Sequence, residues 1–136
     1  MHVPSVPLYQ LRAGVDYIQV PCGSCIGCRL DYSRSWAIRA MHEASLYPQN
    51  SFVTLTYAPA YLPADKSLHL EHVQKFFKRL RKRFAGKKIR LMYCGEYGDK
   101  MGRPHYHVIL FNHQFDDLRL WSKRHGNLYY RSETLE

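Results

Sequence analysis

The sequence predicts an α+β domain in which helices pack on one face of a small antiparallel sheet. Segments with apolar residues three to four positions apart alternate with short segments of β-branched and aromatic residues. A glycine-containing turn joins the last two of these short segments, as in a β-hairpin. A chain of 136 residues can bury one hydrophobic core but not two, so we expect a single domain with small appendages.

Two segments have the periodicity of a helix. The first is 29–47, which Pro48 ends, and its apolar side contains Trp36, Ala40, Met41 and Ala44. The second extends from about His69 to Phe84, and its buried stripe contains Leu70, Val73, Phe76, Phe77, Leu80 and Phe84.

Three segments are expected to form the sheet. "SFVTLTY" (51–57) alternates apolar residues with threonines and therefore has one apolar and one polar face. "KKIRLMYCGEY" (87–97) and "HYHVILF" (105–111) are the two strands of the hairpin, with "GDKMGRP" as its turn. Helices on one face leave the other face open for a ligand.

The two ends of the chain are less regular. Short strands are expected at 9–11 and 17–20, whereas the segment after 112 is polar and weakly patterned. The motifs divide the chain into an N-terminal segment with a cysteine knuckle, a core and a C-terminal segment, at 1–28, 29–115 and 116–136.

The charge predicts a polyanionic partner. The chain has 20 Lys and Arg against 11 Asp and Glu, a formal net charge of +9, and nucleic acid is the first candidate. The longest uncharged stretch, 44–64, contains three prolines and cannot form a membrane-spanning helix. The N-terminus lacks the features of a secretory signal, so we expect a soluble intracellular protein without a membrane partner.

His105 and His107 are a candidate metal site. Residues i and i+2 of a strand point to the same side, and neutral imidazoles are good ligands for divalent metals. Glu96 lies nine positions before His105, and the hairpin returns it close to the histidines as a candidate oxygen ligand. The alternative is a pair of half-exposed strand histidines beside a solvated carboxylate.

A basic run follows the start of the second helix. No acidic residue lies between His72 and Gly95, and the mutual repulsion of these cations favours a phosphate backbone as partner over a merely solvated helix face. The candidate DNA-binding residues are Lys75, Lys78, Arg79, Arg81, Lys82, Arg83, Lys87, Lys88 and Arg90.

The knuckle "PCGSCIGCR" is a candidate structural zinc site. Cys22, Cys25 and Cys28 have a two-residue spacing that can present three thiolates to one Zn²⁺. The fourth ligand would be Cys94 or His42. The alternative is a small cluster of reduced, metal-free thiols.

The chain resembles the replication initiation proteins of small single-stranded DNA phages of the gokushovirus type, including the chlamydial phages. Four segments carry the resemblance, in the same order: "VPCGSCIGCRLDYSRSWAIRAMHEA", "FVTLTY", "CGEYGD" and "GRPHYHVILF". Those proteins are HUH endonucleases, named for two histidines around one bulky hydrophobic residue, here His105, Tyr106 and His107.

The resemblance implies a rolling-circle initiator with an RRM-like sheet. His105 and His107 would hold Mg²⁺ or Mn²⁺, with Glu96 as third ligand, and a tyrosine hydroxyl would attack the scissile phosphate, leaving a 5′-phosphotyrosyl link and a 3′-hydroxyl. The implied partners are single-stranded DNA at a replication origin and the host replication machinery, in the bacterial cytoplasm.

The family's nucleophile is a tyrosine on a helix after the histidines, with a lysine about one turn away. None of the 11 tyrosines has Lys or Arg four positions later, and Tyr129 and Tyr130 are the candidates that remain after the histidines. Because the family proteins are longer, we expect a truncated or remnant copy that has the metal half of the site and lacks the nucleophile.

Three functions follow as hypotheses. The first is a rolling-circle nickase whose tyrosine comes from elsewhere. The second is a non-catalytic single-stranded DNA-binding module, or a non-functional phage remnant in a bacterial genome, which we favour over nicking by this chain alone. The third is a zinc-knuckle RNA-binding protein unrelated to replication.

Overall fold

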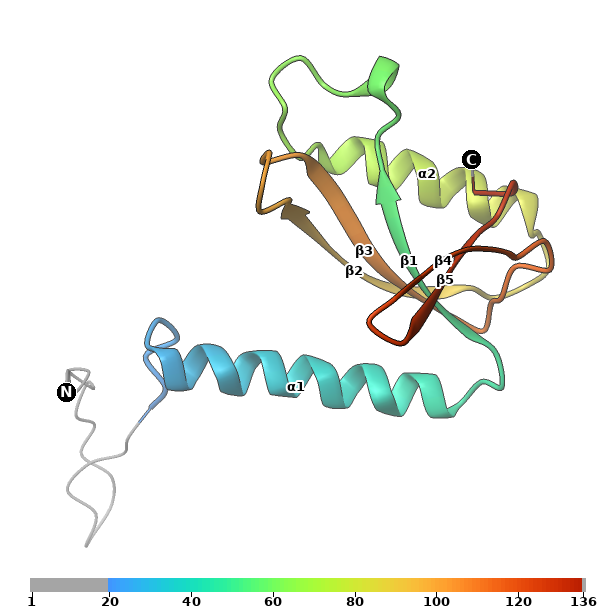
Figure 1. Cartoon of the computed structure of the whole chain (residues 1–136). Helices are drawn as coiled ribbons and strands as arrows, with labels where there is room; N and C mark the ends of the chain where they lie inside the picture. Colours follow the sequence, from blue (N-terminus) through green and yellow to red (C-terminus); the bar gives the residue numbers. More distant parts are fainter. Residues whose placement is uncertain (1–19, 136) are drawn as a thin grey trace, which may run out of the picture. The chain divides into compact units, whose positions relative to one another are not determined.

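The computed structural model describes residues 20–135 (Figure 1). The chain forms two compact units, 1–42 and 43–136, and each is described by itself. The strand predicted at 9–11 and most of the one predicted at 17–20 lie outside the described residues. The division of the chain that the motifs indicate, at residues 28 and 115, stays a prediction. Among the described helices, none has the length and apolarity needed to cross a membrane.

Helix α1 spans Ile26–Ser45 and begins slightly earlier than predicted. The side-chain amide of Asn50 donates to the carbonyls of Ala44 and Tyr47, at 3.0 and 3.1 Å, and so satisfies carbonyl groups that the end of the helix leaves free. None of the residues of α1 is buried. The burial predicted for its apolar side is therefore not observed.

The main sheet has three antiparallel strands, β1 (Asn50–Thr56), β2 (Arg90–Tyr97) and β3 (Pro104–Phe111). The order is β1-β3-β2, so β3 is paired on both sides. The turn between β2 and β3 is closed by two backbone hydrogen bonds, from Gly98 to Arg103 at 3.0 Å and from Gly102 to Gly98 at 2.8 Å. The predicted hairpin is thus present.

Helix α2 (Leu70–Arg83) covers one face of this sheet (Figure 1). Its buried side chains, Val73, Phe77 and Leu80, share one hydrophobic cluster with alternate residues of β3. The strand residues in that cluster are Tyr106, Val108 and Leu110, together with Val53 of β1. The two helices and the antiparallel sheets confirm the predicted α+β class, and α2 supplies the packing on the sheet.

The C-terminal segment contains an unexpected hairpin of β4 (Arg119–Arg124) and β5 (Asn127–Arg131). Its turn has positive φ at both central residues, 49° at His125 and 82° at Gly126, which is the signature of a type I′ turn. Asn-Gly is the usual sequence of such a turn, so "HG" between two charged, short segments is a weak signal.

The base of this hairpin is fixed by Asp117. Its carboxylate accepts hydrogen bonds from the Ser132 hydroxyl at 2.6 Å and the Thr134 amide at 2.8 Å, and these bonds lower the pKa of Asp117 to about 2. Leu135, which follows, packs against the core of the main sheet. The hairpin is therefore attached to the domain through its second strand.

Leu110 offers a test of the core. It is 1% exposed at the centre of β3, and Leu110→Ala should lower the free energy of unfolding by about 2–5 kcal/mol because a cavity replaces buried methyl groups. Urea unfolding monitored by circular dichroism measures the change. Ile109→Ala is the matched control, since Ile109 lies on the other face and is only half-buried; an equal loss there would contradict the assignment of faces.

Candidate metal centre

The two histidines of β3 point away from α2. Tyr106 and Val108, which alternate with them, are buried against that helix, so His105 and His107 lie on the opposite face of the sheet. The register places Glu96 of β2 directly beside His105. The three predicted ligands are therefore brought together by strand pairing alone.

The ligand atoms of these residues converge. Glu96 Oε2 lies 3.0 Å from His107 Nε2 and 3.6 Å from His105 Nε2, and one ligand atom from each residue falls within 4.8 Å of the others. The two imidazole rings are nearly perpendicular, at 89°. Two imidazole nitrogens and a carboxylate oxygen are a donor set that suits a divalent cation and leaves coordination positions free.

A backbone carbonyl fixes the tautomer of His105. Its Nδ1 lies 3.2 Å from the carbonyl oxygen of Arg103, which can only accept a hydrogen bond, so the proton of the neutral ring is on Nδ1. The lone pair is then on Nε2, the atom that faces Glu96. Such a hydrogen bond to the distal nitrogen is the usual way in which a protein orients a metal-binding histidine.

Thr54 performs a similar role for His107. Its hydroxyl lies 3.2 Å from Nδ1 of that ring, across the β1–β3 pair. Because a hydroxyl can both donate and accept, it can hold His107 while Nε2 donates to Glu96 and also while Nε2 binds a metal. On its other side His107 stacks on Phe52, with ring centroids 5.5 Å apart.

Gly95 matters on the side of α2. It pairs with Tyr106, and a Cβ built there would lie 2.8 Å from a methyl group of Leu68. A larger residue would therefore push that loop away from the sheet. This packing explains why glycine precedes Glu96 in "CGEYG".

The predicted basic run is divided by the fold. Six of its residues lie on α2, and that helix covers the face opposite the histidines. Two members of the run have carboxylate partners, Lys75 with Glu71 and Arg90 with Glu43, at 2.9 and 2.8 Å. The expectation of wholly uncompensated cations is therefore wrong for these two, because their partners come from before the run.

Tyr129 and Tyr130 lie on β5 and not on a helix. They are about half exposed, at 44% and 50%, and no hydrogen bond joins either hydroxyl to the metal centre within the described part of the chain. A role as nucleophile stays a prediction for both.

The three cysteines of the knuckle are also brought together. Their sulfur atoms lie within 4.8 Å of one another, and the Cys25 amide and the Ser24 hydroxyl donate to the sulfur of Cys22. These hydrogen bonds lower the pKa of Cys22 to about 6, which favours the thiolate that a metal needs.

The fourth zinc ligand is only partly resolved. His42 is excluded, because α1 is continuous from Ile26 to Ser45 and a rise of ~1.5 Å per residue places it about 20 Å beyond Cys28. Cys94 lies on β2, in the other compact unit, and its role as a zinc ligand stays a prediction.

A cavity of ≈ 390 Å³ lies away from the histidines, along the edge strand β1 on the side of α2. Its lining combines apolar side chains with Tyr57, His72, Lys75 and Arg79. The phenol of Tyr57 meets Nδ1 of His72 at 3.0 Å, and burial raises the pKa of Tyr57. No sequence pattern predicts this cavity, because its residues come from distant segments.

An antiparallel sheet that presents two histidines and a carboxylate on one face is the arrangement that the resemblance to replication initiators implies. The family model of the replication-associated protein ORF2 matches residues 50–134, the part of the chain that contains the sheet, α2 and the second hairpin. The chain belongs to this family of replication-associated proteins.

Three curated relatives come from bacterial viruses. The chain is 35% identical to the replication-associated protein VP4 of Bdellovibrio phage phiMH2K, over 85% of this chain and 44% of the relative. It is 44% identical to the replication-associated protein ORF2 of Spiroplasma virus 4 (73% and 33%) and 41% identical to ORF4 of Chlamydia phage 1 (68% and 24%). The chain thus spans less than half the length of each. No solved structure matches.

The metal centre can be tested through Thr54. Thr54→Val should lower Mn²⁺ affinity about 10- to 100-fold, because it removes the hydroxyl that orients His107, and His107→Ala should abolish tight binding. Isothermal titration calorimetry measures both. Thr56→Val is the matched control on the same strand and face; if it weakens binding as much as Thr54→Val, the orienting role is wrong.

The cysteine cluster can be tested with Co²⁺ as a substitute for Zn²⁺. The parent should show the absorption of a cobalt–thiolate centre, and Cys25→Ser should lose it, whereas His105→Ala should keep it. Cys94→Ser reports on the fourth ligand. A parent that gives no thiolate absorption would leave the three cysteines as free thiols.

Proposed function

We propose that this chain carries the metal-binding half of a rolling-circle replication initiator that nicks single-stranded DNA at an origin. The observation that carries the proposal is the convergence of Glu96, His105 and His107 on one face of the sheet in a member of a replication-associated family. Its place of action would be the bacterial cytoplasm, with the host replication machinery as a further partner.

The three side chains would hold Mg²⁺ or Mn²⁺. The ion would polarise the scissile phosphate and stabilise the charge that develops on it. Glu96 contributes the negative charge of the donor set, and the Arg103 carbonyl and Thr54 hydroxyl hold the imidazoles in place. Phe52, stacked on His107 and 69% exposed, offers an aromatic surface for a base next to the scissile phosphate.

The covalent step needs a tyrosine beside this site. Its oxygen would bond to phosphorus as the bond from phosphorus to the 3′ oxygen breaks, and the 3′ oxygen would gain a proton from solvent. The products are a 5′-phosphotyrosyl enzyme and a free 3′-hydroxyl primer. We propose that the tyrosine comes from outside the described site, because neither Tyr129 nor Tyr130 is hydrogen-bonded to it.

A second candidate is a single-stranded DNA-binding module that breaks no bond. The absence of a tyrosine hydroxyl hydrogen-bonded to the three ligands, among the described residues, favours it. The exposed aromatic ring of Phe52 and the net charge of +9 suit both functions.

A chimera separates the two functions. This chain replaces the aligned segment of the phiMH2K relative, and the product is incubated with Mn²⁺ and single-stranded oligonucleotides tiled across that phage genome. We expect a cleaved strand and a covalent adduct on a denaturing gel, and a loss of at least ~100-fold for His105→Ala or His107→Ala, because both ligands are needed.

The unaltered relative, assayed alongside, is the control for substrate and conditions. A chimera that binds the oligonucleotides without cleaving them, where the relative does cleave, would favour the binding module. An adduct formed by this chain alone and lost with Tyr129→Phe or Tyr130→Phe would contradict the external nucleophile.

A further inference from the structure

The β4–β5 hairpin is a basic and aromatic element that the metal centre does not use. Residues 119–131 contain four Lys or Arg and no acidic residue. Large apolar side chains of this hairpin are exposed on both strands, including Trp121 at 50% and Tyr129 at 44%. Exposure of so much aromatic surface on a short hairpin is unusual unless a ligand covers it.

The register gives the hairpin two different faces. Cross-strand partners share a face, and the pairs Arg119–Arg131, Ser122–Tyr129 and Arg124–Asn127 lie on one side. The pairs Leu120–Tyr130 and Lys123–Leu128 lie on the other. The first face collects three of the four cations, and the second is mainly apolar.

Trp121 belongs to the cationic face. It is the extra residue at the register shift between Leu120 and Ser122, and a bulge of this kind re-aims a side chain. The guanidinium carbons of Arg131 and Arg124 lie 4.5 and 5.3 Å from the centre of its ring. Two cations thus flank one half-exposed aromatic ring.

The charges of this face are only partly compensated. Arg119 pairs with Glu133 at 2.9 Å, whereas Arg124 and Arg131 have no carboxylate partner among the described residues. Both therefore remain available for phosphate.

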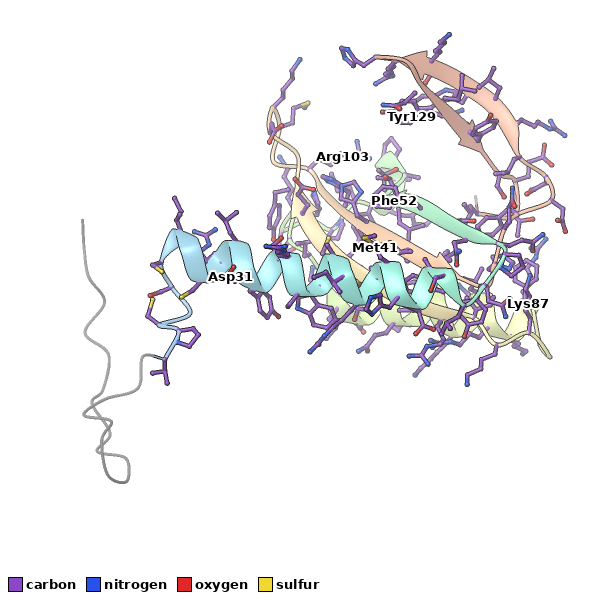
Figure 2. The ribbon with its side chains drawn as sticks, turned by 90° about the horizontal axis from the view of Figure 1, so that it is seen from below. Asp31, Met41, Phe52, Lys87, Arg103 and Tyr129 are labelled. Carbon is purple, nitrogen blue, oxygen red and sulfur yellow. The ribbon has the colours of Figure 1, made fainter. Side chains whose placement is uncertain are left out.

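We propose that this face, made by Arg119, Trp121, Arg124, Tyr129 and Arg131, binds single-stranded DNA. Bases stack on Trp121 and Tyr129 while Arg124 and Arg131 hold the phosphates between them, the combination that single-strand binding requires. The inference deepens the proposed function by naming a second DNA contact, yet it involves no residue of the metal centre. Figure 2 shows Tyr129 on the hairpin, with Phe52 and Arg103 on other segments.

Tryptophan fluorescence can report this contact directly. The chain has only two tryptophans, so Trp36→Phe leaves Trp121 as the single reporter. The experiment titrates this variant with oligo(dT) in EDTA, so that divalent metals make no contribution. We expect quenching of Trp121, because stacked bases quench indole emission.

Variants divide the contact into stacking and charge. Trp121→Ala or Tyr129→Ala should weaken binding about 5- to 100-fold, measured by fluorescence anisotropy of labelled oligo(dT), and Trp121→Phe should restore most of it. Arg124→Ala or Arg131→Ala should each reduce the slope of log affinity against log salt by about 0.7.

The other face of the same hairpin supplies matched controls. Lys123→Ala removes a cation and Leu120→Ala removes apolar surface there, and both should bind oligo(dT) like the parent. Circular dichroism spectra like that of the parent show that the hairpin variants remain folded.

Three results would overturn the proposal: no quenching of Trp121, parent-like binding by both Trp121→Ala and Arg131→Ala, or equal quenching by polyglutamate, which has charge but no bases. His107→Ala should bind oligo(dT) in EDTA like the parent. Failure of the nicking chemistry and failure of this surface are therefore separate outcomes.

Discussion

The strict alternation of side chains along β3 is the constraint on which the rest of the structure depends. Because β3 is paired on both sides, its register with β1 and β2 cannot slip by one residue without turning Tyr106, Val108 and Leu110 out of the core. The same register sets Thr54 and Glu96 beside the two histidines. Core burial therefore positions the candidate metal ligands, although none of them lies in the core.

Most of the main sheet and α2 could be predicted from the sequence for this reason. An apolar period of two in "HYHVILF" and of three to four in α2 reflect burial directly, and the glycine-containing turn indicates the hairpin. The metal ligands followed from the same patterns, since strand parity and hairpin return are local properties. The groups that orient them, the Arg103 carbonyl and the Thr54 hydroxyl, could not be predicted because they depend on the exact register.

The C-terminal hairpin was missed for the opposite reason. Neither of its faces is buried in the core, so its sequence lacks the apolar alternation that burial imposes, and the bulge at Trp121 breaks the period of two. Its attachment depends on hydrogen bonds from Ser132 and Thr134 to Asp117, which no periodicity records. A segment kept for surface contacts is in general less visible in sequence than one kept for packing.

The position of α2 limits how a DNA strand could use the whole molecule. The cations of this helix lie on the side of the sheet opposite the histidines, so a strand bound at the metal centre reaches them only by passing around an edge. At the β1 edge, Thr56 pairs with His105 and also lines the cavity that contains Lys75 and Arg79. Under the proposed function, this edge is the short path between the scissile phosphate and the basic helix, and it would bend the strand sharply beside the site of cleavage. Single-stranded DNA tolerates such a bend and a stiff duplex does not, so the geometry itself favours a single-stranded substrate.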